Sequence, residues 1–194
     1  EISACLVGSE MCIRDRYRTG QYMELDLTAR RNLELTETLR SKEKKGSLLW
    51  VLDKTKTAMG ARNLRAWLQQ PLVDVAAIDR RLSAVAALAE HTVAREELTL
   101  ALSGIADMER LIGRVVYGSA GGRDLVSLRA SMERLPAVKA QLAAFPSGAL
   151  HQLDQQLEDL NDLAALIGET LVDEPPFSVR EGEMIRDGFD PEVD

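Results

Sequence analysis

The chain has 194 residues, of which 45% are hydrophobic, 28% charged and only 4% aromatic, and its formal net charge is −7. This length suffices for one ordinary domain with a sizeable core. Neither a membrane-spanning run nor a secretory leader is apparent, so we expect a cytoplasmic protein without membrane contact. Because aromatic and β-branched residues are scarce while Ala and Leu dominate, the composition favours helices over sheets.

The charge is unevenly distributed. Residues 17–72 carry a net charge of +5, residues 73–146 are neutral and residues 147–194 carry −11. The acidic end should repel phosphate backbones, so only the first third could touch nucleic acid. We interpret the basic run Arg40–Lys45 as a solvated loop, since no basic stripe with a reading element accompanies it.

Residues 1–16 lack the periodicity of the rest and hold both cysteines, Cys5 and Cys12. The string from Ala4 to Arg16 resembles translated sequencing-adapter sequence, so we treat residues 1–16 as a non-native or disordered segment. The alternative, a metal or redox site, has a poor spacing for zinc, because no further Cys or His lies nearby.

The first predicted elements are short. Tyr22–Asp26 alternates and could form a brief strand, and Asp26 or Thr28 caps a helix expected to run through Leu35. A polar loop over residues 42–46 precedes an apolar helical turn at residues 47–52.

The clearest helix runs from Thr57, a suitable N-cap, to Gln70, where Pro71 ends it. Gly60 inside it has two interpretations: a frayed first turn, or close packing of another backbone. Trp67 lies in the apolar stripe of this helix, as Trp50 does in the preceding turn, so we predict both to be core anchors.

Helical spacing continues beyond Asp74. Apolar stripes of three further helices consist of Ile78, Leu82, Val85 and Ala89; residues within 93–102; and Met108, Leu111, Ile112 and Val115. Arg110 and Arg114 lie four apart beside the last stripe, where two like charges repel. Either Asp107 or a carboxylate from another helix should offset this repulsion, and a solvated cluster is the remaining alternative.

Asp124 is expected to cap the next helix, whose stripe is Leu125, Leu128, Met132 and Leu135. Pro136 can begin another, and Pro146–Gly148 is a clear break. The seam that follows consists of Leu150, Leu153, Leu157, Leu160, Ala164, Ile167 and Leu171. It is typical of a coiled coil or of a helix within a bundle, and we favour the bundle because the flanking positions lack paired charges.

No catalytic constellation is present in the sequence. His91 and His151 lie in different predicted helices and read as surface or helix-end residues. Four carboxylates, of Asp154, Glu158, Asp159 and Asp162, fall within the seam helix without the loop geometry of a calcium site. Because the phosphate-binding string Gly-x₄-Gly-Lys-Ser/Thr is also missing, we predict no enzyme activity, cofactor or metal for this chain.

Five motifs nevertheless resemble, in order, the core domain of the MutS DNA mismatch repair family. They are Asp26–Leu35, Thr57–Leu72 (Thr-x-Met-Gly-x-Arg-x-Leu-x-x-Trp-Leu-x-x-Pro-Leu), Asp107–Arg110 with Arg123–Leu125, Pro175–Pro176 and Gly188–Asp190. The resemblance implies an all-α multi-helix bundle over residues 17–194, truncated before the DNA clamp, with at most short strands near residues 22–26 and 177–186. It also implies structural or coupling roles for Asp26, Arg31, Asn32, Gly60, Arg62, Trp67, Pro71, Arg110, Arg114 and Asp124.

The function implied is that of the parent, an ATP-dependent sensor of mismatched DNA. The parent would bind ATP and Mg²⁺, act as a homodimer with other repair proteins, and touch DNA through domains missing from this chain. This piece would couple the ATPase to the DNA-gripping domains through rigid helices. The alternative is a stand-alone helical scaffold or partner-binding module.

Overall fold

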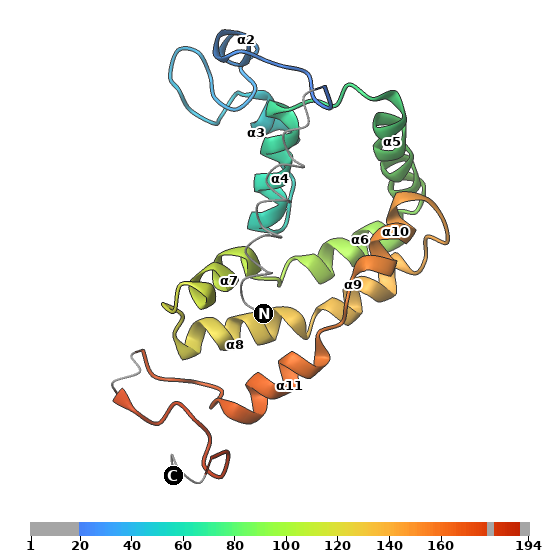
Figure 1. Cartoon of the computed structure of the whole chain (residues 1–194). Helices are drawn as coiled ribbons and strands as arrows, with labels where there is room; N and C mark the ends of the chain where they lie inside the picture. Colours follow the sequence, from blue (N-terminus) through green and yellow to red (C-terminus); the bar gives the residue numbers. More distant parts are fainter. Residues whose placement is uncertain (1–19, 178–180, 191–194) are drawn as a thin grey trace. The chain divides into compact units, whose positions relative to one another are not determined.

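The structure of the chain is a computed structural model that describes residues 20–177 and 181–190 (Figure 1). These residues form an all-α protein, as predicted, and extended pairing among them is limited to two isolated antiparallel bridges, Tyr22 with Leu72 and Leu171 with Ile185. The strands expected near residues 22–26 and 177–186 are therefore reduced to single pairs. Residues 1–16 lie outside the described part, so their foreign origin stays a prediction.

The chain divides into two compact units. The first takes its described residues from 20–54 and 62–82, and the second from 55–61, 83–177 and 181–190. No helix in the described part is long and apolar enough to cross a bilayer.

The first unit begins with two short helices, α2 (Leu27–Asn32) and α3 (Leu48–Leu52). Of the two predicted caps, Asp26 is the one that caps α2, because its carboxylate accepts a hydrogen bond from the Ala29 N–H at 2.6 Å. The helix was expected to reach Leu35 but ends at Asn32, since Glu34 adopts a left-handed φ of +47° that an α-helix cannot continue. Leu35 and Leu49 are the buried apolar side chains here.

Helix α4 (Ala58–Gln69) has the start and stop predicted for it. The Thr57 hydroxyl accepts the Gly60 N–H at 3.0 Å, and α4 ends just before Pro71, whose carbonyl accepts the Met23 N–H at 2.8 Å. A Cβ on Gly60 would lie 3.0 Å from Thr57 Oγ1, within the same turn. Of the two interpretations of Gly60, close packing of another backbone is not what the structure shows, because the nearest atoms belong to the side chains of Thr57 and Thr55.

The tryptophans are not core anchors, contrary to prediction. Trp50 is 48% exposed and Trp67 is 42% exposed. The Arg81 guanidinium carbon lies 3.8 Å from the Trp67 ring centroid, in a cation–π contact between α4 and α5 (Val75–Glu90). An amphipathic stripe indicates a contact face, and on this face the contact is with a charged side chain.

The second unit contains the remaining helices: α6 (Thr92–Leu102), α7 (Met108–Val116), α8 (Gly122–Met132), α9 (Leu135–Leu142), α10 (Gly148–Gln156) and α11 (Asn161–Thr170). Helices α6 and α10 pack on α9, and α7 and α11 pack on α8 (Figure 1). One core cluster consists of Val138, Leu142, Phe145 and Leu150, and another of Leu128, Met132 and Ala164. His91 lies at the N-cap position of α6 with its ring edge-on to Phe145, which fits the helix-end position expected for it.

The predicted seam helix over residues 150–171 is in fact two helices. Helix α10 ends at Gln156, Leu157 is extended, and Leu160 has a left-handed φ of +51° before α11 begins at Asn161. The physical reason is tertiary, because the Lys139 ammonium on α9 donates to the Leu157 carbonyl at 3.0 Å. The acidic residues of the seam consequently do not lie in one helix, contrary to prediction.

Candidate functional site

The charged residues singled out on α7 each have a carboxylate partner. Asp107 caps α7 by accepting the Arg110 N–H at 3.3 Å, and its other oxygen lies 3.5 Å from Arg110 Nε. The Arg114 guanidinium donates to Asp124 Oδ1 at 2.7 Å, from α7 to α8. Both carboxylates considered from the sequence are therefore used: Asp107 pairs with Arg110, and Asp124 of another helix pairs with Arg114.

Asp124 belongs to the first turn of α8. The helix begins at Gly122, three residues earlier than predicted, so Asp124 is its third residue rather than its cap. Its Oδ2 accepts the Gly121 N–H at 3.2 Å, which satisfies a backbone donor that the helix leaves free. This backbone hydrogen bond, followed by that from Arg114, lowers the pKa of Asp124 below its usual value.

The segment after α11 is attached to the same end of α8. Arg123 Nε donates to the Pro175 carbonyl at 3.0 Å, and the Arg123 guanidinium carbon lies 4.3 Å from the centroid of the Phe177 ring. Pro175 is buried against Gly122, where an added Cβ would lie only 2.8 Å from the proline Cβ. A glycine is required at this position because the returning chain approaches the helix so closely.

A second set of ion pairs holds this segment farther along α8. Asp173 Oδ1 accepts from Arg129 Nη1 at 3.2 Å and from Arg186 Nη2 at 2.7 Å. Arg129 also pairs with Glu133 at 2.7 Å, and Arg186 donates to the Leu171 carbonyl at 2.6 Å. The Arg186 hydrogen bond, followed by that from Arg129, lowers the pKa of Asp173. We call Arg123, Arg129, Asp173, Pro175 and Arg186 the tail clamp.

Sequence reasoning missed the tail clamp. The Arg129–Glu133 pair has a local signal, because opposite charges four apart face each other on a helix. Arg129 and Asp173 are 44 residues apart, and nothing in the sequence pairs them. The Pro175–Pro176 motif marked the right place, since Pro175 is the residue that meets α8.

The profile of the family described as MutS domain III matches residues 28–187. The chain belongs to the MutS family. The DNA mismatch repair protein MutS of Desulforamulus reducens is 49% identical over 178 residues, which cover 92% of this chain and 20% of the relative.

Two further relatives carry the same printed name. That of Lachnoclostridium phytofermentans is 47% identical over 92% of this chain and 19% of its own length, and that of Brevibacillus brevis is 45% identical over 96% and 22%. The chain therefore spans about a fifth of the length of the curated relatives it matches, and the resemblance found from the motifs is confirmed.

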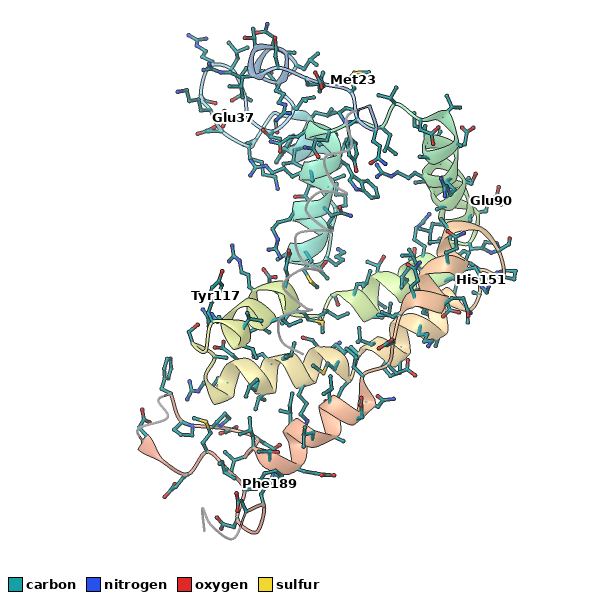
Figure 2. All side chains as sticks on the ribbon, in the orientation of Figure 1. Met23, Glu37, Glu90, Tyr117, His151 and Phe189 are labelled. Carbon is teal, nitrogen blue, oxygen red and sulfur yellow. The ribbon has the colours of Figure 1, made fainter. Side chains whose placement is uncertain are left out.

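Within this MutS domain III, α7 exposes an apolar face beside the paired arginines. Tyr117, at the end of α7, is 88% exposed (Figure 2), Val116 is 78% exposed, and Ile112 and Val115 are each about half exposed. Met108 and Leu111 on the other side pack towards Leu128 and Met132. The single apolar stripe of α7 is thus only partly covered: Met108 and Leu111 pack against a core cluster, whereas Ile112, Val115 and Val116 are exposed.

Most of the remaining predicted residues belong to the first unit. Arg31 and Asn32 are exposed in the last turn of α2, and Arg62 is half-buried in α4. With Asp26, Trp67 and Pro71 they belong to the first unit. In the described part, no group of three or more His, Cys, Asp or Glu side chains could hold a metal ion.

Proposed function

We propose that this MutS domain III is a mechanical core that couples nucleotide hydrolysis to the gripping of mismatched DNA in a whole mismatch repair protein. The relatives are each named as DNA mismatch repair proteins, which supports the process. ATP and Mg²⁺ would bind elsewhere in the whole protein, since this sequence has no phosphate-binding loop. The whole protein would act in the cytoplasm as a homodimer with other repair proteins.

The coupling proposal rests on the points where the chain crosses from one unit to the other. Two of these crossings lie inside helices, between Ala61 and Arg62 in α4 and between Leu82 and Ser83 in α5. A helix is stiffer than a loop because each of its residues is fixed by backbone hydrogen bonds. A movement imposed on one unit would therefore reach the other through these helices.

The test weakens the crossing in α5 while leaving the crossing in α4 intact. This domain replaces the matching region of the Desulforamulus reducens relative, and Leu82→Gly is combined with Val85→Gly in α5. Both side chains are exposed, so the change acts on helix stiffness and costs roughly 1–2 kcal/mol in helix propensity. Val93→Gly with Leu100→Gly in α6 is the matched control, because it removes the same two exposed residue types from a helix within one unit.

We expect the α5 variant to hydrolyse ATP and to bind a mismatched duplex, but with a dissociation rate from DNA that no longer responds to nucleotide. The α6 control should keep that response. A full nucleotide response in the α5 variant would contradict the coupling role.

A further inference from the structure

The break between α10 and α11 has no breaker residue in the sequence. Residues 157–160 are Leu, Glu, Asp and Leu, without proline or glycine, and the apolar spacing that begins at Leu150 continues through them to Leu171. Such spacing is that of one amphipathic helix. The local sequence therefore specifies a continuous helix where the structure has two.

The junction itself is strained and weakly capped. Leu160 has φ +51° and ψ 28°, a left-handed conformation that bulky side chains rarely adopt. In the described part of the chain, no side chain caps the N-terminus of α11. The Asp159 Oδ1 atom is shielded from solvent and 3.7 Å from Lys139 Nζ, beyond hydrogen-bond distance. Strain of this kind persists only where surrounding contacts impose it.

Two electrostatic effects hold the break open. Lys139 on α9 donates to the Leu157 carbonyl at 3.0 Å, and in an unbroken helix that carbonyl would accept the N–H of Asn161 instead. The carboxylates of Asp154, Glu158 and Asp162 are spaced four apart, so an unbroken helix would place three like charges along one face.

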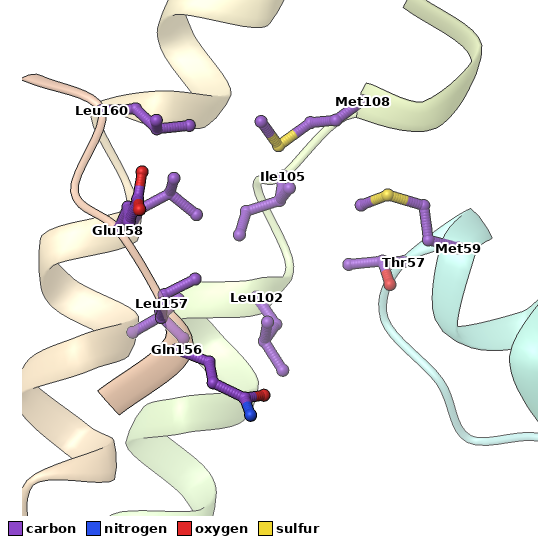
Figure 3. Close-up of a pocket in the computed structure, with 11 residues that line it drawn as sticks. Thr57, Met59, Leu102, Ile105, Met108, Gln156, Leu157, Glu158 and Leu160 are labelled. Atoms are coloured by element: carbon purple, nitrogen blue, oxygen red, sulfur yellow. The ribbon is translucent and has the colours of Figure 1, made fainter. Parts of the chain in front are cut away.

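The structure leaves space beside the junction. An open cavity of about 470 Å³ is lined by Gln156, Leu157, Glu158 and Leu160 of the junction. The opposite wall is apolar and includes Leu102 at the end of α6, Ile105 in the connection that follows, and Met108 at the start of α7 (Figure 3). The cavity gives the junction room to move, and a rearrangement would also shift Leu157 and Leu160, which pack against the two core clusters.

We propose that residues 157–160 are a helix switch, whose second state is one continuous helix from Gly148 to Thr170. Four residues span up to about 13 Å when extended and about 6 Å when helical. Closing the break would therefore draw α10 and α11 together by up to about 7 Å along α9 and α8. The switch is a property of this domain and stands independently of the coupling role.

The test measures the distance between α10 and α11 in the full 194-residue chain. Cys5 and Cys12 are replaced by serine, and spin labels are attached through Gln152→Cys and Glu169→Cys, both at exposed positions. A continuous helix would separate these Cα atoms by about 26 Å. A second label pair, Ala130→Cys with Ala140→Cys on α8 and α9, reports whether the packing of the unit is retained.

Leu160→Ala combined with Lys139→Met removes both the packing of the Leu160 side chain against the core and the Lys139 tether. This variant should give a narrow distance peak near that of a straight helix and a higher helix content by circular dichroism. Leu160→Gly accommodates the positive φ, so this variant should populate only the form in which α10 and α11 are separate helices. Added salt should raise the straight-helix fraction in the unsubstituted chain, because it screens the three carboxylates.

Identical distance distributions for the double variant and Leu160→Gly, with the control pair unchanged, would overturn the proposal. If the control pair moves in the double variant, the same comparison is made with Leu160→Ala alone. A Leu160→Ala distribution equal to that of Leu160→Gly would then overturn it equally.

Discussion

Ser131 is the side chain whose removal should most sharply test the packing of the second unit. It is only 1% exposed and lies on the inner face of α8. Its hydroxyl accepts the Ala106 N–H at 3.0 Å, from the connection between α6 and α7, and donates to the Ser127 carbonyl at 2.8 Å. Ser131→Ala keeps the helix but leaves the Ala106 N–H without this acceptor.

The expected cost follows from that lost acceptor. Leaving a buried donor unsatisfied costs about 1–3 kcal/mol, and we expect the lower part of this range, about 1–2 kcal/mol, because Ala106 is half-buried. The Ser127 carbonyl loses little, since it remains within the hydrogen-bonding ladder of α8. For a chain of this size, such a change lowers the melting temperature by roughly 2–8 °C.

The measurement compares Ser131→Ala with Ser127→Ala, the same substitution one turn earlier on α8. The exposed Ser127 hydroxyl donates only to the Arg123 carbonyl, at 2.8 Å, so its loss should change stability by less than about 0.5 kcal/mol. Urea unfolding is followed by far-UV circular dichroism, because both tryptophans lie in the first unit and Ser131 in the second. Amide exchange at Ala106 should also accelerate in Ser131→Ala alone. Equal unfolding midpoints for the two variants would refute the reasoning.

Three further outcomes are expected. Gly122→Ala should destabilise the chain by about 1–3 kcal/mol in thermal unfolding, because its Cβ would meet Pro175, whereas Gly113→Ala in α7, with no atom within 4 Å, should stabilise by up to about 1 kcal/mol; equal effects would show that the tail is not packed on α8. Trp67→Ala should cost about 1–2 kcal/mol by urea unfolding, less than the ~3–5 kcal/mol of a buried aromatic, because the ring is partly exposed; a loss within the buried range would contradict that exposure. Because the folded pKa of Asp124 is lowered, its contribution to stability is present above its unfolded pKa of 3.8 and is lost as the pH falls through the folded value. The free energy of unfolding, measured from pH 6 to 2.5, should therefore decrease less steeply for Asp124→Asn than for the unsubstituted chain. Parallel pH profiles would count against the ion pair with Arg114.

Local signals predicted most of the helices. Thr57 and Pro71 set the two ends of α4, and both were predictable because they act on backbone groups within a few residues. Arg114 was expected to need an acidic partner because like charges four residues apart repel. Burial was harder to predict: Leu82 and Val85 have helical spacing yet are exposed, since periodicity defines a face without saying what covers it. The break at Leu160 depends on Lys139 in another helix, and the tail clamp depends on residues tens of positions apart.

The tail clamp affects which amino-acid substitutions this domain can accumulate. Asp173 joins two arginines, but Arg129 retains Glu133 and Arg186 retains the Leu171 carbonyl if Asp173 is lost. Arg123 separately holds Pro175 through the proline carbonyl, an acceptor that most substitutions preserve. No single replacement among these residues removes every attachment of the segment, so neutral substitutions can accumulate there one at a time. No second contact can compensate for a side chain at Gly122, so this position should tolerate substitution least.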